Sequence, residues 1–106
     1  MNKFVVMSAS ARFVDFWIDG RIKIIRDGDF PYSIYSDWRE RKDYKEFKPL
    51  LDKSYQDVIR LYADELLVGN FEGYIGESTQ AEIEVARLKG IPIKYYYPIG
   101  VENDKT

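Results

Sequence analysis

The chain contains no histidine and no cysteine. These two absences exclude Ser-His-Asp and Cys-His nucleophile systems, disulfide bonds and ordinary structural zinc sites. If the protein is an enzyme, its chemistry must come from carboxylates, lysine, arginine, tyrosine or hydroxyl side chains.

The chain also lacks long apolar runs and any excess of charge of one sign. No stretch approaches the roughly 20 apolar residues that cross a bilayer, and the apolar run at residues 4–7 is too short for a signal sequence. The formal net charge is −2, with acidic and basic residues interspersed. Such a surface does not attract a nucleic acid polymer or a membrane. We accordingly expect a cytoplasmic protein with neither of these partners.

Apolar and aromatic side chains are plentiful enough for a folded core. With 106 residues, of which 45% are hydrophobic and 16% aromatic, the chain has the size of one domain with a modest core. We assign residues 1–100 to this domain and residues 101–106 to a polar C-terminal tail. A small domain so rich in aromatic rings is expected to cover apolar surface with a second copy, as a homodimer.

Predicted strands and helices alternate along the chain. Short apolar runs predict strands, whereas apolar residues at helical spacing, with Pro49 near the start, predict a helix ending at Tyr62. The full expected order is a strand over 3–7, a short helix over 12–19 ended by Gly20, a strand over 21–26, the helix over 49–62, a strand over 65–70, a helix with the inner stripe Ala81, Val85 and Leu88 that Gly90 stops, and a strand over 91–97. This alternation predicts an α/β, Rossmann-like (flavodoxin-like) three-layer domain with a four- to five-stranded, mainly parallel sheet.

Two loops should meet at the carboxyl edge of this sheet, where ligands bind in such folds. One loop follows the first strand, and the other follows the strand that ends in Asn70. Their hydroxyl groups, their guanidinium group and the amides at a helix start suit a phosphate or the polar edge of a sugar. The side chains concerned are Ser8, Ser10, Arg12, Ser78 and Thr79.

Glu82 has two interpretations. If Thr79 is the N-cap of the helix, Thr79 to Glu82 form a capping box, in which the glutamate reaches back to the amide of Thr79 and no chemistry is implied. Alternatively, a carboxylate beside two anion-binding loops suggests that the ligand is a phosphate-bearing glycoside or ester. The local sequence leaves both interpretations open.

A longer motif resembles a known family. The stretch LYADELLVGNFEGYIGESTQAEIEVARLKGIPIKYY, residues 61–96, resembles the C-terminal half of the nucleoside 2-deoxyribosyltransferase-like superfamily, especially small bacterial and phage members with a GYIGEST-x-x-EI motif. MSASARF at residues 7–13 resembles the GS-x-RF loop that opens the same proteins, with alanine and serine where the family has glycine. The resemblance implies a Rossmann-like domain that cleaves or transfers the N-glycosidic bond of a 2-deoxynucleoside or its 5′-monophosphate. It also implies a mechanism that needs neither a metal ion nor a cofactor, so we expect none.

The same resemblance assigns roles to individual residues. It implies that Glu82 is the nucleophile and that Asn70 faces the sugar. Asp57 is the nearest match to an acidic residue that orients the substrate, whereas Asp64 is expected to be structural. The remaining positions match loops that contact the substrate: Ser8, Ser10, Arg12, Ser78 and Thr79.

The aromatic segment 30–47 has no clean period and is either a partly helical excursion or a mobile flap. Its rings could stack on a nucleobase as a lid, or pack over the sheet or a partner subunit. The rings in question are Tyr32, Tyr35, Trp38 and Tyr44, and the charge run over 37–43 is expected to be a solvated helix face.

Three functions therefore remain open. The first is an N-glycosidase or deoxyribosyltransferase. The second is a non-catalytic nucleotide-binding module, such as a phage accessory protein or a sensor of a signalling nucleotide. The third is a structural homodimer that uses the aromatic flap as its interface.

Overall fold

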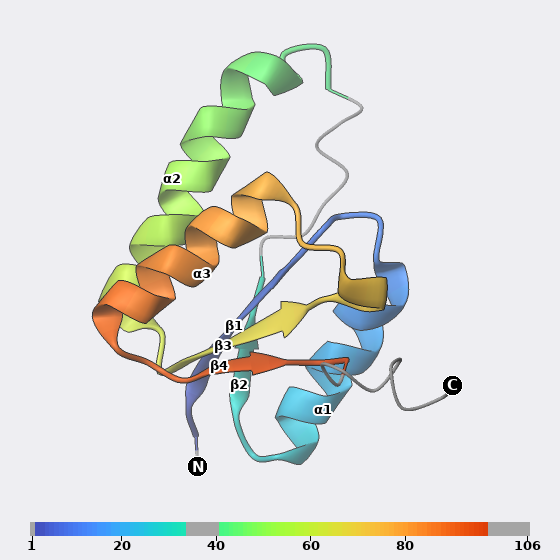
Figure 1. Ribbon diagram of the computed structural model, residues 1–106, viewed down its shortest axis with the longest axis vertical. Coiled ribbons are helices and arrows are strands. Elements are labelled where there is room, and N and C mark those ends of the chain that lie inside the picture. The colour runs from blue at the N-terminus through green and yellow to red at the C-terminus, as the bar shows by residue number, and fades with distance from the viewer. Residues whose placement is uncertain (1, 34–40, 98–106) are drawn as a thin grey trace.

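The computed structural model describes residues 2–33 and 41–97 and has the expected α/β class. Four parallel strands form one sheet in the order β2-β1-β3-β4, in a Rossmann-like three-layer arrangement (Figure 1). The strands are β1 (Phe4–Ala9), β2 (Phe30–Tyr32), β3 (Glu65–Gly69) and β4 (Ile93–Tyr95). The helical elements are η1 (Phe16–Gly20), α1 (Arg21–Arg26), α2 (Tyr44–Tyr62), η3 (Phe71–Gly73) and α3 (Glu77–Lys89).

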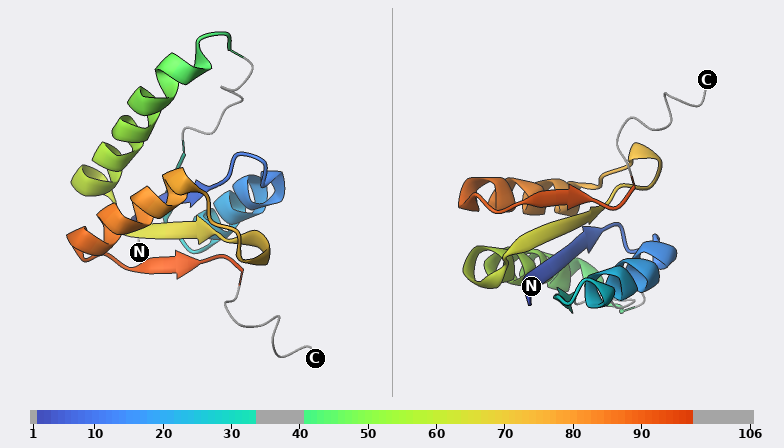
Figure 2. Two further views of the ribbon diagram at one scale, coloured as in Figure 1. Left: turned by 45° about the horizontal axis from the view of Figure 1, so that its top comes forward. Right: turned by 90° about the horizontal axis from the view of Figure 1, so that it is seen from below.

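The sheet has a separate apolar core on each face. Alternate residues of a strand point to opposite faces, so Val6 packs with α2 and α3, whereas Val5 and Met7 pack with η1 and α1. The arrows of β1, β3 and β4 point the same way in both views of Figure 2, and β2 pairs with β1 in parallel. By the same alternation, Ser8 points to the face that α2 and α3 cover.

The segment after β1 differs from its prediction. Residues 21–26 were expected to form a strand, but they form α1, which continues from η1 without a break. Gly20 does not end the helix, because its φ of −63° is helical. A Cβ at Gly20 would lie 3.1 Å from the Met7 Cε atom, so this glycine serves close packing of the helix on the sheet.

The strand that pairs with the outer edge of β1 is instead β2, within the segment that had no clean period. Phe30, Pro31 and Tyr32 pair with Phe4, Val5 and Val6. A proline is tolerated there because β2 is an edge strand. The ring of Tyr32 packs against Tyr55 and Phe4, with centroids 5.8 and 5.5 Å away, which confirms that this ring packs over the sheet.

The two long helices begin earlier than predicted. α2 starts at Tyr44 rather than near Pro49, which lies inside the helix. α3 starts at Glu77 with Gly76 as its N-cap. The buried face of α3 also differs from the prediction: Leu88 of the expected inner stripe is 73% exposed, and the residues buried on α3 are Thr79, Glu82 and Ala86.

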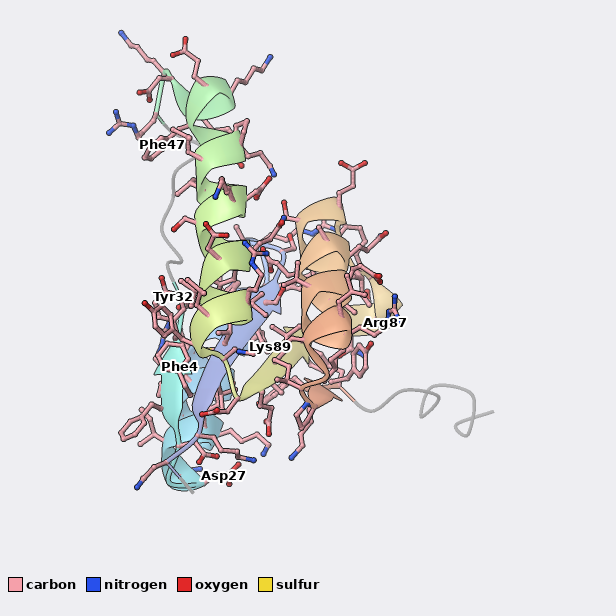
Figure 3. All side chains as sticks on the ribbon, turned by 90° about the vertical axis from the view of Figure 1, so that its left-hand side faces the viewer. Phe4, Asp27, Tyr32, Phe47, Arg87 and Lys89 are labelled. Carbon is pink, nitrogen blue, oxygen red and sulfur yellow. The ribbon has the colours of Figure 1, made fainter. Side chains whose placement is uncertain are left out.

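The ends of α2 and α3 are joined by a lysine. The ammonium group of Lys89, on α3, donates to the carbonyl oxygens of Ile59 and Ala63 at the end of α2, at 3.0 and 2.9 Å. Figure 3 shows Lys89 between the two helices. The Ile59 carbonyl also accepts the Ala63 amide at 3.3 Å, and Ala63 is the C-cap residue of α2, so Lys89 caps this end of α2 from outside. Gly90, at φ 83°, ends α3 as predicted.

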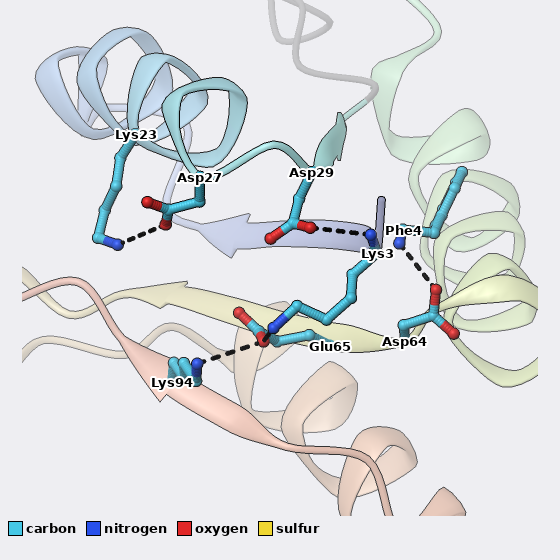
Figure 4. Close-up of polar contacts among 8 residues, drawn as sticks. All are labelled: Lys3, Phe4, Lys23, Asp27, Asp29, Asp64, Glu65 and Lys94. Atoms are coloured by element: carbon cyan, nitrogen blue, oxygen red, sulfur yellow. Dashed lines mark hydrogen bonds and ion pairs between the residues drawn. The ribbon is translucent and has the colours of Figure 1, made fainter. Parts of the chain in front are cut away.

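A polar network holds the amino ends of the strands (Figure 4). The Asp64 carboxylate accepts a hydrogen bond from the Phe4 amide at 2.8 Å, which confirms the structural role expected for it. The buried Glu65 carboxylate lies 2.8 Å from the ammonium of Lys3 and 3.5 Å from that of Lys94. The polar side chains at the amino ends of the strands are therefore paired with one another within the chain.

Some expectations fall outside the described residues. These are the tail over 101–106, the rings of Tyr35 and Trp38, and most of the charge run over 37–43. Within the described ranges, no helix has the length and apolar character to span a bilayer.

Candidate functional site

Glu82 is buried on the inward face of α3, and its carboxylate meets the first strand. The residue is 5% exposed. The hydroxyl of Ser8, itself 1% exposed, donates a hydrogen bond to Glu82 Oε1. Ser8 is the next-to-last residue of β1, at the carboxyl edge of the sheet, where ligands bind in folds of this kind. The predicted meeting of Ser8 and Glu82 is therefore present.

The capping interpretation of Glu82 is wrong. Because α3 begins at Glu77, Thr79 lies inside the first turn and Glu82 in the second, beyond the reach of a capping box. The N-cap is Gly76, and no side chain caps the helix. Glu82 thus has no structural duty at the helix start that accounts for its burial.

A second carboxylate and a lysine lie next to Glu82, on α2. The ammonium of Lys48 donates to Asp52 Oδ2 and to the hydroxyl of Ser78, both at 2.7 Å. The Ser78 hydroxyl donates to Asp52 Oδ1 at 3.1 Å. These three side chains link the N-terminal half of α2 to the first turn of α3. The Lys48 and Asp52 charges both act on the Glu82 carboxyl group.

The environment of Glu82 favours its neutral form. Burial raises the pKa of its carboxyl to about 8, and the negative charge of Asp52 acts in the same direction. The hydrogen bond from Ser8 and the positive charge of Lys48 oppose the shift. At Lys48, partial burial acts to lower the pKa, but the hydrogen bond and charge of Asp52 outweigh it and the net shift is upward. Strongly shifted carboxyl groups of this kind gather at functional sites.

Tyr55 fixes the end of β1 on the same face. The β1–β2 ladder ends at the pair Val6–Tyr32. Just beyond it, the buried Tyr55 hydroxyl donates to the carbonyl of Met7. Burial raises the pKa of Tyr55 well above its ordinary value, and the negative charge of Glu82 adds to the shift. The residue next to Ser8 is thereby held in place by the helix that carries Asp52.

The two loops at the carboxyl edge meet as predicted, through aromatic contacts. The guanidinium of Arg12, in the loop after β1, lies 4.4 Å from the centroid of the Tyr74 ring in the loop after β3. The rings of Phe13 and Phe71 are 5.7 Å apart. The Arg12 amide is 3.4 Å from the Ser10 hydroxyl oxygen. Arg12 is exposed and stacks on these rings, so it does not join the Glu82 cluster.

Two further predicted site residues are engaged elsewhere. The Asn70 side chain donates to the Tyr97 carbonyl at 2.9 Å and accepts from the Tyr97 amide at 3.0 Å. It therefore ties the end of β3 to the segment after β4. Asp57 forms ion pairs with Lys53 and Arg60 on α2. The structure thus joins Ser8 to Glu82 and Ser78 to Lys48 and Asp52, and it buries Thr79 one turn before Glu82 on α3. Ser10, Arg12, Asn70 and Asp57 do not join these contacts.

Asp52 and Lys48, whose charges act on Glu82, were not predicted from the sequence to belong to the site. The buried residues of α2 are Tyr55 and Ile59. Continuing the same helical face towards the N-terminus gives Asp52 and then Lys48, at the spacing i, i+4, i+7 and i+11. The sequence signal that could have indicated these two residues is this polar continuation of the apolar face of α2.

A preformed metal site is not evident near these carboxylates: within residues 2–33 and 41–97, no group of three or more Asp or Glu side chains is placed to share an ion. No family model, curated protein or solved structure matches the chain. The site must therefore be interpreted from its own geometry.

Proposed function

We propose that the protein cleaves or transfers the N-glycosidic bond of a 2-deoxynucleoside or its 5′-monophosphate, with Glu82 as the nucleophile. The observation that carries the proposal is the placement of Glu82. Its carboxyl is buried, contacts Ser8 at the carboxyl edge of the sheet and serves no capping role. Burying a carboxyl group without a structural need costs free energy, which a chemical role explains.

The chemistry fits the side chains at hand. The ionised Glu82 carboxylate attacks C1′ of the sugar, and the C1′–N bond breaks with its electron pair going to the base, which takes up a proton. The resulting glycosyl ester is then attacked at C1′ by water or by a second base, which releases the carboxylate with overall retention. Neither step requires histidine or cysteine, which the chain lacks.

The neighbours of Glu82 would supply positioning and charge control. Ser8 donates a hydrogen bond to one oxygen of the Glu82 carboxylate and thereby fixes the orientation of this group. Burial is the main cause that raises the pKa of Glu82; Asp52 raises it further and Lys48 lowers it, so these two charges adjust how much of the nucleophile is ionised. Hydroxyl groups of the sugar would bind Asp52 and Ser78, and the resemblance to the deoxyribosyltransferase-like superfamily supports a deoxyribose ring.

Base release tests the proposal. The protein is incubated with a panel of deoxynucleosides and their 5′-monophosphates, and free base is separated by chromatography. We expect release by the wild type and its loss in Glu82→Gln. Glu84→Gln is the matched control, because Glu84 lies on the exposed face of the same helix and pairs with Arg87. Equal release by wild type and Glu82→Gln would contradict the role of Glu82.

A second candidate is nucleotide binding without turnover. It is favoured by the pKa of about 8, because Glu82 is then largely neutral at pH 7 and both donates and accepts hydrogen bonds, as recognition of a sugar hydroxyl requires. Heat of binding in calorimetry, with no release of base from any substrate of the panel, would select this function.

We also propose that the protein acts as a homodimer. The described part of the chain leaves many large apolar side chains between 42 and 73% exposed, which is typical of a surface that meets a partner.

A further inference from the structure

The helical segment formed by η1 and α1 carries an apolar stripe on its outer side. Val14, Ile18, Ile22 and Ile25 are 49, 53, 42 and 57% exposed. They recur at the spacing i, i+4, i+8 and i+11 along one continuous helical segment. The opposite side of the segment packs on the sheet through Phe16, Trp17 and Ile24. The stripe is therefore a second apolar face, additional to the one that the core uses.

Charges beside the stripe change sign along the helix. Asp15 and Asp19 lie in the first half, and Lys23 and Arg26 in the second. Lys23 pairs with Asp27 at 3.0 Å. By contrast, Asp15 and Arg26 are exposed and form no ion pair with any of residues 2–33 or 41–97. The Asp15 carboxylate and the Arg26 guanidinium, at opposite ends of the stripe, are thus available for ion pairs with a second molecule.

We propose that this stripe is the interface between two copies of the chain, which pack their η1–α1 helices antiparallel about a two-fold axis. The inference rests on the proposed homodimer and is independent of the chemistry of Glu82. The midpoints of Val14–Ile25, Ile18–Ile22 and Asp15–Arg26 fall at positions 19.5, 20 and 20.5 of the chain. A two-fold axis near residue 20 therefore matches apolar with apolar, and acid with base.

A two-fold arrangement makes each contact twice. Asp15 of one copy faces Arg26 of the other, and the reverse pair forms at the opposite end of the helices. A parallel arrangement would instead place like charges together, which costs free energy. A surface hollow lined by Asp19, Ile22, Lys23, Arg26, Asp27 and Tyr96 adjoins the stripe. Ile22 belongs to both and Arg26 lies beside the stripe, so the second copy would also cover this hollow.

The interface lies on the face of the sheet opposite to Glu82. Glu82 and its neighbours are on the α2 and α3 side, whereas η1 and α1 cover the other side (Figure 1). Dimerisation by this face leaves the candidate site uncovered and adds no residue of the second copy to it. A variant that cannot dimerise should therefore keep whatever base-release activity the wild type has.

Sedimentation velocity over a concentration series tests the interface. We expect a dimer for the wild type and at least about 100-fold weaker association for Ile22→Glu, because a central apolar contact is replaced by a charge. Leu88→Glu is the matched control, since Leu88 is 73% exposed on α3, and it should associate as the wild type does. Circular dichroism confirms that each variant is folded.

Charge reversal tests the antiparallel geometry. Asp15→Arg and Arg26→Asp should each weaken association roughly tenfold, because each replaces two attractive pairs by two repulsive ones. An equimolar mixture of the two variants should recover a heterodimer, and the double variant should recover the homodimer. A monomeric wild type, or a dimer that Ile22→Glu leaves intact, would overturn the interface. Failure of the double variant to recover would overturn the antiparallel pairing. Base release by Ile22→Glu reports separately on the function of Glu82.

Discussion

Replacing Glu82 by glutamine should change how stability depends on pH, whether or not a substrate is known. The carboxyl has a pKa of about 8 in the folded protein, against an ordinary value of 4.5. Between these two values the folded state keeps a proton that the unfolded state has lost. Raising the pH through this window therefore favours unfolding, at about 1.4 kcal/mol per pH unit.

The magnitude is large for a domain of this size. Linkage gives a loss of about 2 to 3 kcal/mol between pH 5 and pH 7 from this one group, against a total stability on the order of 5–15 kcal/mol. Glutamine has nearly the same shape, stays neutral and still accepts the hydrogen bond from Ser8. Glu82→Gln should therefore lack this loss and be more stable than the wild type at pH 8.

Urea unfolding followed by circular dichroism at intervals from pH 5 to pH 8 measures the effect. The free energy of unfolding of the wild type should fall relative to Glu82→Gln as the pH rises. Glu84→Gln serves as the control, because the hydrogen bond and the charge of Arg87 outweigh desolvation at Glu84 and hold its pKa below the ordinary value. Parallel curves for the wild type and Glu82→Gln over the whole range would refute a buried, neutral Glu82.

Four further substitutions test the surroundings of the site and the packing of the fold. If base release is observed, Asp52→Asn should move the rising limb of the pH profile of kcat/KM to lower pH, because Asp52 raises the pKa of Glu82. Lys48→Met should move the same limb to higher pH, because Lys48 lowers that pKa. Profiles that do not move would exclude an effect of these two charges on Glu82. Gly69→Ala should destabilise the protein by about 1–3 kcal/mol in thermal or urea unfolding. The reason is that a Cβ at residue 69 would lie 2.6 Å from Phe16 Cγ. Unchanged stability would show that the Phe16 ring can move away without cost. Lys89→Met should cost about 1 kcal/mol through the uncapped carbonyls of α2, whereas Lys45→Met, at the exposed start of the same helix, should cost almost nothing.

The sequence predicted the parts of the fold that depend on local signals. Phe4–Ala9 and Glu65–Gly69 are strands because short buried apolar runs in an α/β protein have few other places to lie. Gly90 ends α3 because it adopts a left-handed conformation. The meeting of Ser8 with α3 followed from the rule that the carboxyl ends of parallel strands share an edge.

The remaining features depend on tertiary packing. The run at 21–26 holds three isoleucines among three basic residues and was predicted to be a strand, because a short run of this kind does not distinguish a strand from a helix. In the structure it continues the helix that packs on Met7 through Gly20. The buried face of α3 was misjudged because Ala81, Val85 and Leu88 were taken as its inner stripe, whereas the buried residues are Thr79, Glu82 and Ala86. The N-cap is Gly76, three residues before Thr79, so Glu82 lies in the second turn and not at a capping position.

Choosing between Asp52 and Asp57 required the orientation of α2. The two residues lie five apart and hence on different faces of the helix. Burial of Tyr55 and Ile59 places Asp52 towards α3, and Asp57 on the side of Lys53 and Arg60. The proximity of Asp52 to Glu82 could therefore be recognised only once the buried face of α2 was known.

Trapping of the sugar on the protein tests the central proposal most directly. A deoxynucleoside bearing fluorine at C2′ slows hydrolysis of a glycosyl ester, since it disfavours the oxocarbenium-like transition state. Intact-mass measurement followed by peptide mapping should locate one fluorodeoxyribosyl group on Glu82, with none on Glu82→Gln. Release of base without any adduct on Glu82, or an adduct on another residue, would contradict the role assigned to this carboxylate.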